Sequence, residues 1–181
     1  MKIKRVAIAG LAAAGIVVGG TAIPASADTH PYSNNGLGPH PILRYGQVNE
    51  NVRALQWMLN CEGHTLKTPS RFGPQTLQAV KNLQAKHHVD QGADGNVGAA
   101  TWHSLYMSSA STRHGSKNDC VKAVQVLLNK WKYNDDLPIT GYQGDRTTRK
   151  LQRFQKEHGQ AATGYADHDT FHKLIYIPAG K

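Results

Sequence analysis

The sequence predicts an all-α protein, and three observations support this prediction. First, two segments 69 positions apart match: residues 93–105 read ADGNVGAATWHSL and residues 162–174 read ATGYADHDTFHKL. Second, apolar residues recur with the i, i+3, i+7 spacing of one helix face. Third, no segment alternates apolar and polar residues for long enough to indicate a central strand. We therefore expect two tandem copies of a small helical unit.

Residues 1–27 have the pattern of a secretory signal peptide, with an uncleaved anchor as the alternative. A basic start is followed by the apolar run VAIAGLAAAGIVVGG, and ASA at residues 25–27 is a small-residue cleavage site. Cleavage would lower the net charge from +9 to +6, because the peptide holds three basic residues and no acidic one. A basic exported protein favours anionic partners such as cell-wall polymers, membranes or acidic glycans, and nucleic acid is the weaker expectation. Residues 28–42, rich in Pro, Gly and Asn, are expected to be an irregular lead-in.

The first helix of each copy is predicted by an apolar stripe behind an asparagine cap. Val52, Leu55 and Leu59 share one face of the helix in the first copy. The second copy repeats the stripe with Val121, Val124 and Leu128. Asn49 and Asn118 stand at the N-cap positions, where their side chains can accept the unpaired amides of the first turn.

The second and third helices of each copy follow glycine turns. The second helices are expected to begin after Gly73 and Gly144, and the third helices carry Trp102 in one copy and Phe171 in the other. This places repeat one at residues 43–106 and repeat two at residues 113–177, joined by a small, polar linker at residues 107–112. Each unit of about 65 residues is near the lower size limit for a self-sufficient core.

The chain has two cysteines, Cys61 and Cys120, and an exported protein favours a disulfide between them. The alternative is two buried free thiols. Cys61 lies at the end of the first helix of repeat one, and Cys120 lies near the start of the equivalent helix of repeat two. A bond between them would fix the orientation of the repeats.

Three blocks in repeat one resemble the peptidoglycan-binding domain family of three-helix cell-wall modules. The blocks are LRYGQVNENVRALQWMLN, FGPQTLQAVKNLQ and DGNVGAATWHSL, and the similarity covers residues 43–175. Repeat two departs from the pattern: Gln143 replaces the aromatic residue of Phe-Gly, and TGYAD stands where repeat one has DGNVG. The resemblance implies a helical fold and a cell-wall ligand, more securely for repeat one.

A wall-binding module needs polar groups and aromatic surfaces around a concave site. We expect ligand contacts from loop residues beside the aromatic positions, namely Arg71, Phe72, Asp94, Asn96 and Trp102 in repeat one and Tyr142 and Tyr165 in repeat two. Two of these have a competing structural explanation. Asp94 fits a turn that bonds its own backbone, and Trp102 fits a core position.

The sequence does not predict an enzyme. His168 and His172 have the i, i+4 spacing that could begin a zinc site, but a third ligand and a His-Glu-x-x-His motif are absent from the sequence pattern. A disulfide would leave no cysteine nucleophile, and no Gly-x-Ser-x-Gly motif occurs. We therefore expect no catalytic residues, no metal and no cofactor.

The sequence is compatible with three functions. We expect a secreted, non-catalytic protein that binds peptidoglycan or a related wall glycan, alone or with a separate hydrolase or other wall protein as partner. A protein-binding, inhibitory or structural wall factor on the same fold is the alternative. A zinc-dependent wall hydrolase is the weakest candidate.

Overall fold

The structure is a computed structural model that describes residues 40–89, 92–131 and 135–176. These residues form six α-helices and no strand, which confirms the all-α prediction. The helices are α1 (Glu50–Cys61), α2 (Pro74–Lys86), α3 (Ala99–Ser108), α4 (Asp119–Asn129), α5 (Asp145–Glu157) and α6 (His168–Tyr176). None of these six helices has the length and apolar character needed to cross a membrane. The predicted signal peptide and residues 28–39 of the lead-in lie outside the described residues.

The helices start where the sequence indicated. The Asn49 side chain accepts the amide of Val52 at 3.0 Å, and the Asn118 side chain accepts the amide of Val121 at 3.0 Å. Gly73 precedes α2 in an extended conformation, with Pro74 at the first helical position, where its missing amide hydrogen has no cost. Helix α3 continues through Ser108, so it extends two residues into the expected linker at residues 107–112. The Ser109 hydroxyl donates to the Leu105 carbonyl at 2.7 Å and so satisfies an unpaired group of the last turn.

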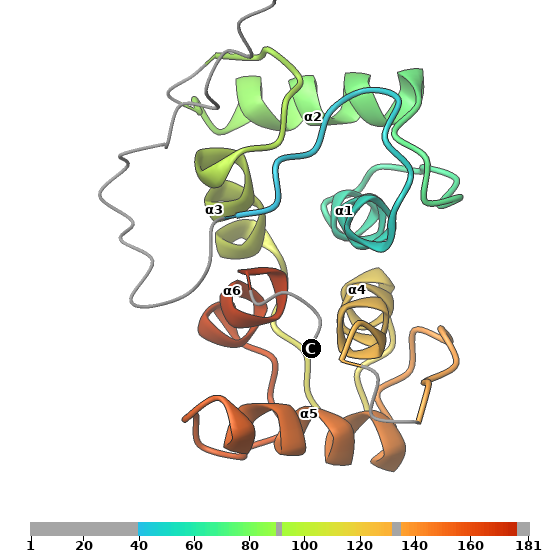
Figure 1. The fold of residues 1–181 in the computed structure, drawn as a ribbon, viewed down its shortest axis with the longest axis vertical. Helices are drawn as coiled ribbons and strands as arrows, with labels where there is room; N and C mark the ends of the chain where they lie inside the picture. The colour runs from blue at the N-terminus through green and yellow to red at the C-terminus, as the bar shows by residue number, and fades with distance from the viewer. Residues whose placement is uncertain (1–39, 90–91, 132–134, 177–181) are drawn as a thin grey trace, which may run out of the picture.

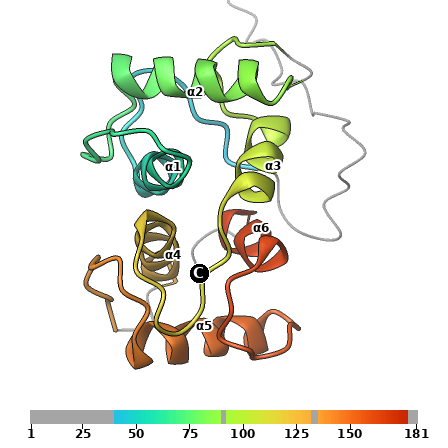
Figure 2. The same cartoon turned by 180° about the vertical axis from the view of Figure 1, so that it is seen from behind.

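The two repeats pack against each other and share one core. Figures 1 and 2 show α1 and α3 below α2, α4 and α6 above α5, and the two halves meeting where α1 faces α4 and α3 faces α6. A single buried cluster contains side chains from both halves, among them Leu55 and Phe72 of repeat one and Leu127 and Phe154 of repeat two. Each repeat therefore completes its small core with the other.

Helices α1 and α4 run antiparallel, as two contacts at their ends show. The predicted disulfide is present: Cys61 at the end of α1 is bonded to Cys120 in the first turn of α4, with Cα atoms 5.2 Å apart. At the other end, the Lys130 Nζ donates to the Asn51 Oδ1 at 2.6 Å. The repeat offset aligns Asn51 with Cys120 and Cys61 with Lys130, so the two pairs occupy equivalent positions. An approximate twofold relation therefore exchanges the two helices, with a covalent bond at one end and a polar contact at the other.

The Lys130 side chain in this polar contact is partly buried. Burial lowers the pKa of Lys130 from 10.5 to about 8, because desolvation disfavours its charged form. The unfolded chain then binds more protons than the folded chain between pH 8 and 10.5. This group therefore makes the folded state more stable as the pH rises through that interval.

Replacing this lysine should remove a pH-dependent cost. We expect Lys130→Met to be more stable than the parent near pH 7.5, and the difference should shrink by about 2 kcal/mol between pH 7.5 and 10. Urea unfolding of both proteins at several pH values measures this difference, with Lys67→Met in an exposed loop as the control. A difference that stays constant with pH would show that Lys130 carries no depressed pKa.

Candidate functional site

Four buried glutamines hold the turns that carry the predicted ligand contacts. Each glutamine lies on one helix and its side-chain amide binds the turn that leads into the next helix. The pairs are Gln56 with the turn at 69–71, Gln84 with 94–96, Gln125 with 140–142 and Gln155 with 163–165. The four glutamines are 1 to 2% exposed, so these bonds are shielded from water.

The turn held by Gln84 shows the full pattern. The Gln84 Oε1 accepts the amide of Gly95 at 2.8 Å, and the Nε2 lies 2.8 Å from the Asn96 carbonyl and 3.0 Å from the Thr101 hydroxyl. Gly95 has a φ of +83°, which a residue with a side chain rarely adopts, and a Cβ there would lie 2.3 Å from the Leu77 side chain. The backbone angle therefore favours glycine here, and a Cβ would in addition displace the Leu77 side chain.

The equivalent turns of repeat two keep the pattern despite their different sequence. Gln125 accepts the amide of Gly141 at 3.0 Å, and Gln155 accepts that of Gly164 at 2.8 Å. Threonine hydroxyls replace the Asp94 carboxylate: Thr140 accepts the amide of Tyr142, and Thr163 accepts that of Tyr165, each at 3.1 Å. The sequence drift in repeat two therefore changed the turn residues and retained the turn geometry.

The first turn of repeat one is the exception. Ser70 occupies the glycine position with a φ of 62°, a left-handed conformation that disfavours a residue with a Cβ. The Gln56 Nε2 still donates to the Arg71 carbonyl at 2.9 Å and to the Thr76 hydroxyl at 3.0 Å. The Gln56 Oε1 is buried and accepts no hydrogen bond from the described residues. This turn is therefore less completely bonded than the other three.

Each turn exposes the residue that follows the glycine position. These residues are Arg71, Asn96, Tyr142 and Tyr165, four of the seven predicted contacts, and all four are exposed. Asp94 is also exposed, but its carboxylate accepts the Asn96 backbone amide at 2.8 Å and the Asn96 side-chain amide at 2.7 Å. Asp94 thus shapes its turn, as the competing explanation held.

Two predicted contacts were wrong. Phe72 is 0% exposed and Trp102 is 1% exposed, so neither ring can contact a ligand in this fold. The turn directs the residue after Arg71 inward, and the indole Nε1 of Trp102 donates to the Pro41 carbonyl at 2.8 Å. Gln143, at the Phe72 position in repeat two, is also buried and donates to the Gly164 carbonyl at 2.8 Å.

The segment before α1 joins the two turns of repeat one into one surface, which we call the repeat-one face. An antiparallel bridge pairs Val48 with Arg71, and another pairs Leu43 with Val97, next to Asn96. The segment from Ile42 to Val48, which contains both bridge residues, exposes three large hydrophobic side chains: Ile42 at 39%, Tyr45 at 59% and Val48 at 60%. The repeat-one face therefore consists of Ile42, Tyr45, Val48, Arg71 and Asn96. The first three were not predicted from the sequence, where the available signal was an apolar residue in a loop before a capped helix.

Repeat two builds an equivalent surface, the repeat-two face. Bridges pair Lys117 with Tyr142 and Thr112 with Ala166, next to Tyr165. Tyr142 is 48% exposed and Tyr165 is 38% exposed. The His114 Nε2 lies 3.0 Å from an Asp145 oxygen. The repeat-two face consists of His114, Lys117, Tyr142 and Tyr165 and is more polar and aromatic than the repeat-one face.

The two faces lie at opposite ends of the α1–α4 pair. Tyr45, Val48 and Arg71 adjoin the start of α1, since the Asn49 amide donates to the Ser70 carbonyl at 3.0 Å. The Asn118 amide donates to the Gly141 carbonyl at 3.0 Å, which places Tyr142 at the start of α4. Because the helices are antiparallel and 12 and 11 residues long, the N-terminal ends of α1 and α4 are separated by about 17 Å along the helix axes. A short ligand therefore cannot contact the residues at both N-terminal ends at once.

The described histidines are spread over both repeats. Within residues 40–89, 92–131 and 135–176, no three His, Cys, Asp or Glu side chains are grouped closely enough to hold a metal ion. His172 lies at the α3–α6 contact, where its ring centroid is 6.2 Å from that of His40 and 5.3 Å from that of Tyr106. Burial, and then the charges of His172 and His103, lower the pKa of His40 to about 3. His40 is therefore neutral at physiological pH and packs as an aromatic ring.

The two repeats match a known protein family. A family model described as a putative peptidoglycan binding domain matches residues 48–105 and 117–174. The chain is 28% identical over 179 residues to the N-acetylmuramoyl-L-alanine amidase CwlL of Bacillus licheniformis, covering 82% of the chain and 49% of that protein. It is 26% identical over 180 residues to a probable N-acetylmuramoyl-L-alanine amidase of the same organism, covering 86% and 49%. It is 30% identical over 107 residues to the zinc D-Ala-D-Ala carboxypeptidase of Streptomyces albus G, covering 59% and 39%. The chain thus spans about half the length of the two amidases, or less for the carboxypeptidase.

Proposed function

The chain belongs to the peptidoglycan-binding domain family, and from this premise we propose that it is a secreted, non-catalytic protein that binds cell-wall peptidoglycan through both of its repeats. The observation that carries the proposal is the pair of equivalent faces built on glutamine-held turns. Each face presents exposed aromatic or apolar side chains and a cationic one: Val48 is paired with Arg71 in repeat one, where Tyr45 is also exposed, and Tyr142 is paired with Lys117 in repeat two.

This composition suits the chemistry of peptidoglycan. Sugar rings have apolar faces that pack on aromatic side chains, and the peptide stems carry carboxylates that a guanidinium or ammonium group can bind. Rigid turns support such a site, because side chains that are already ordered lose little conformational entropy on binding. The opposite placement of the two faces supports separate binding events by the two repeats.

The non-catalytic part of the proposal has its own support. Among the described residues, the side chains that could bind a metal ion are dispersed. The named activities of the similar amidases and carboxypeptidase belong to those proteins. Clearing of a wall suspension by the purified protein, abolished by a chelator, would contradict the proposal and favour the zinc-hydrolase alternative.

Sedimentation with purified insoluble peptidoglycan tests the binding. We expect the protein to pellet at low and at moderate salt, because direct contacts at the faces do not depend on long-range charge. Binding by net charge alone would weaken at moderate salt, since exposed charges are screened beyond about 8–10 Å under these conditions. Retention in the supernatant at both salt concentrations would exclude wall binding and favour the protein-binding alternative. Pelleting that disappears with modest salt would show that net charge alone is responsible.

Face variants separate the contributions of the two repeats. We expect Tyr45→Ala/Arg71→Ala and Lys117→Ala/Tyr142→Ala each to weaken binding about tenfold, which corresponds to 1.4 kcal/mol. The combined variant should lose binding altogether. Whole chains are used because the repeats share one core, and Lys67→Ala/Lys86→Ala, two exposed lysines away from both faces, is the control. If only one double variant weakens binding, the proposal for the other repeat is wrong.

A further inference from the structure

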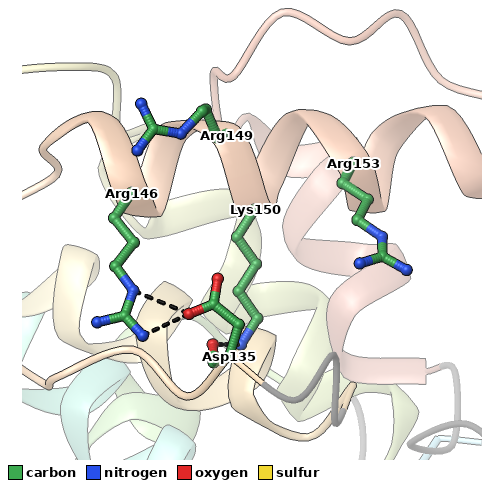
Figure 3. A pocket seen from close by; sticks show the side chains of 5 residues that line it. All are labelled: Asp135, Arg146, Arg149, Lys150 and Arg153. Atoms are coloured by element: carbon green, nitrogen blue, oxygen red, sulfur yellow. Dashed lines mark hydrogen bonds and ion pairs between the residues drawn. The ribbon is translucent and has the colours of Figure 1, made fainter.

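A third surface lies on α5, outside both faces. A pocket of about 310 Å³ is lined by Asp135 and by four cationic side chains of this helix, as Figure 3 shows. The cationic side chains are Arg146, Arg149, Lys150 and Arg153. A concave surface dominated by one sign of charge concentrates the electrostatic field and attracts ions of the opposite charge.

These charges are specific to repeat two. The basic residues of α5 are Arg146, Arg149, Lys150, Arg153 and Lys156. The equivalent positions of α2 in repeat one are Gln75, Gln78, Ala79, Asn82 and Ala85, all uncharged. Both helices serve the same packing role in their repeats, so the fold does not require the five charges.

Lys150 shows this most clearly, because it replaces a core alanine. Ala79 is 3% exposed and Lys150 is 4% exposed. A lysine side chain in repeat two therefore occupies a buried position that the methyl group of an alanine fills in repeat one. The Lys150 Nζ donates to the Asp135 carbonyl at 2.6 Å and to the Asn129 Oδ1 at 3.1 Å. Desolvation lowers the pKa of Lys150, which is a cost of this placement. In return, Lys150 fixes the chain at Asp135, which forms one wall of the pocket.

The arginines supply the exposed charge. Arg146 pairs with the Asp135 carboxylate, and Arg153 pairs with Glu157 at 2.8 Å. Arg149 is exposed and makes no ion pair with any described residue. Spacings of three and four residues place the three arginines on one side of α5 over about 10 Å of its length. Figure 3 shows the side chains of Arg146 and Arg153 extending to the side of the helix where Asp135 lies, with Asp135 below Arg146, and the side chain of Arg149 above the ribbon.

We propose that this α5 surface is a binding site for a linear, phosphate-bearing polyanion, separate from the two faces. A guanidinium group binds phosphate oxygens in pairs, and a row of such groups matches a chain with repeated phosphates better than a single ion. Phosphodiester polymers attached to a cell wall and free polyphosphate share this chemistry. The inference does not depend on peptidoglycan binding by the faces.

Long-chain inorganic polyphosphate is the probe for the first experiment. We expect Arg149→Gln/Arg153→Gln to weaken binding about tenfold and to lower the slope of log affinity against log salt by about 1 to 2, as for two lost phosphate contacts. The control Lys67→Gln/Lys86→Gln removes the same charge from exposed positions of repeat one and should change affinity less than about twofold. Equal losses in both variants, or no binding by the parent, would overturn the proposal.

Wall preparations supply the second experiment. Insoluble walls are compared before and after chemical removal of their phosphodiester-linked polymers. The parent should pellet more strongly with the untreated walls, and the Arg149→Gln/Arg153→Gln variant should show no such preference while it still binds the treated walls. If the variant loses binding to treated walls as well, α5 recognises peptidoglycan itself and the phosphate assignment is wrong. If the parent binds neither preparation but binds polyphosphate, the proposed wall function fails and the α5 site stands.

Discussion

Removing the disulfide should lower the free energy of unfolding by about 4 kcal/mol. The bond joins residues 59 positions apart, and closing a loop of that length restricts the unfolded chain by roughly this amount in the chain-entropy model. Urea unfolding of Cys61→Ala/Cys120→Ala against the oxidised parent measures the change. Alanine is chosen because Cys120 is 0% exposed and a serine hydroxyl there would add a second cost.

The variant should still fold, which makes the measurement possible. The core between α1 and α4 and the Lys130–Asn51 contact at the far end of the pair remain in place. The reduced parent provides a matched control, since it loses the cross-link and keeps both sulfur atoms in the core. A change below about 1 kcal/mol in both proteins would contradict the prediction. It would mean that residual structure restricts the unfolded chain about as much as the bond does.

Much of the fold follows from local signals in the sequence. The offset between the repeats, the asparagine caps and the apolar stripes each depend on short-range chemistry that a single sequence displays. The pairing of Cys61 with Cys120 was predicted because a chain with two cysteines allows one intramolecular bond. These features specify six helices and one connection between the repeats.

The arrangement of the repeats could not be predicted in the same way. The antiparallel packing of α1 on α4 depends on how two helix surfaces fit, and no local pattern encodes that fit. For the same reason, neither the placement of the faces at opposite ends nor the contact between Lys130 and Asn51 could be predicted from the sequence.

The candidate site was predicted in part. The turns were found because glycines and repeated residues mark them, and the exposed Arg71 and Tyr142 follow from that. Phe72 and Trp102 were assigned wrongly because an aromatic residue beside a loop can point outward or inward, and only the tertiary packing decides which. Tyr45 and Val48 were missed for the converse reason: an apolar residue in sequence is usually read as core, and here the segment runs over the surface.

The glutamine-held turns lead to the second large expected effect, a loss of about 3 kcal/mol in Gln84→Leu. Leucine fills similar space but leaves the buried Gly95 amide without its acceptor, and it removes the Gln84 bonds to the Asn96 carbonyl and the Thr101 hydroxyl, which keep a 3.3 Å bond to each other. A buried polar group that loses its hydrogen bond costs about 1 to 3 kcal/mol, and partial hydration of the turn should limit the sum. Urea unfolding measures the loss, and faster hydrogen exchange at the Gly95 amide locates it.

Two other glutamines make this prediction specific. Gln78→Leu on the exposed side of the same helix should change stability by less than about 0.5 kcal/mol, because surface substitutions rarely exceed that value. Gln56→Leu should cost less than Gln84→Leu, because its Oε1 accepts no hydrogen bond from the described residues and Ser70 already holds its turn in a disfavoured conformation. If Gln56→Leu costs as much as Gln84→Leu, the bonds to the glutamine oxygen do not set the rigidity of these turns. The bonds that the glutamine Nε2 atoms donate to the Arg71 and Asn96 carbonyls would then be the ones that hold these two residues in position.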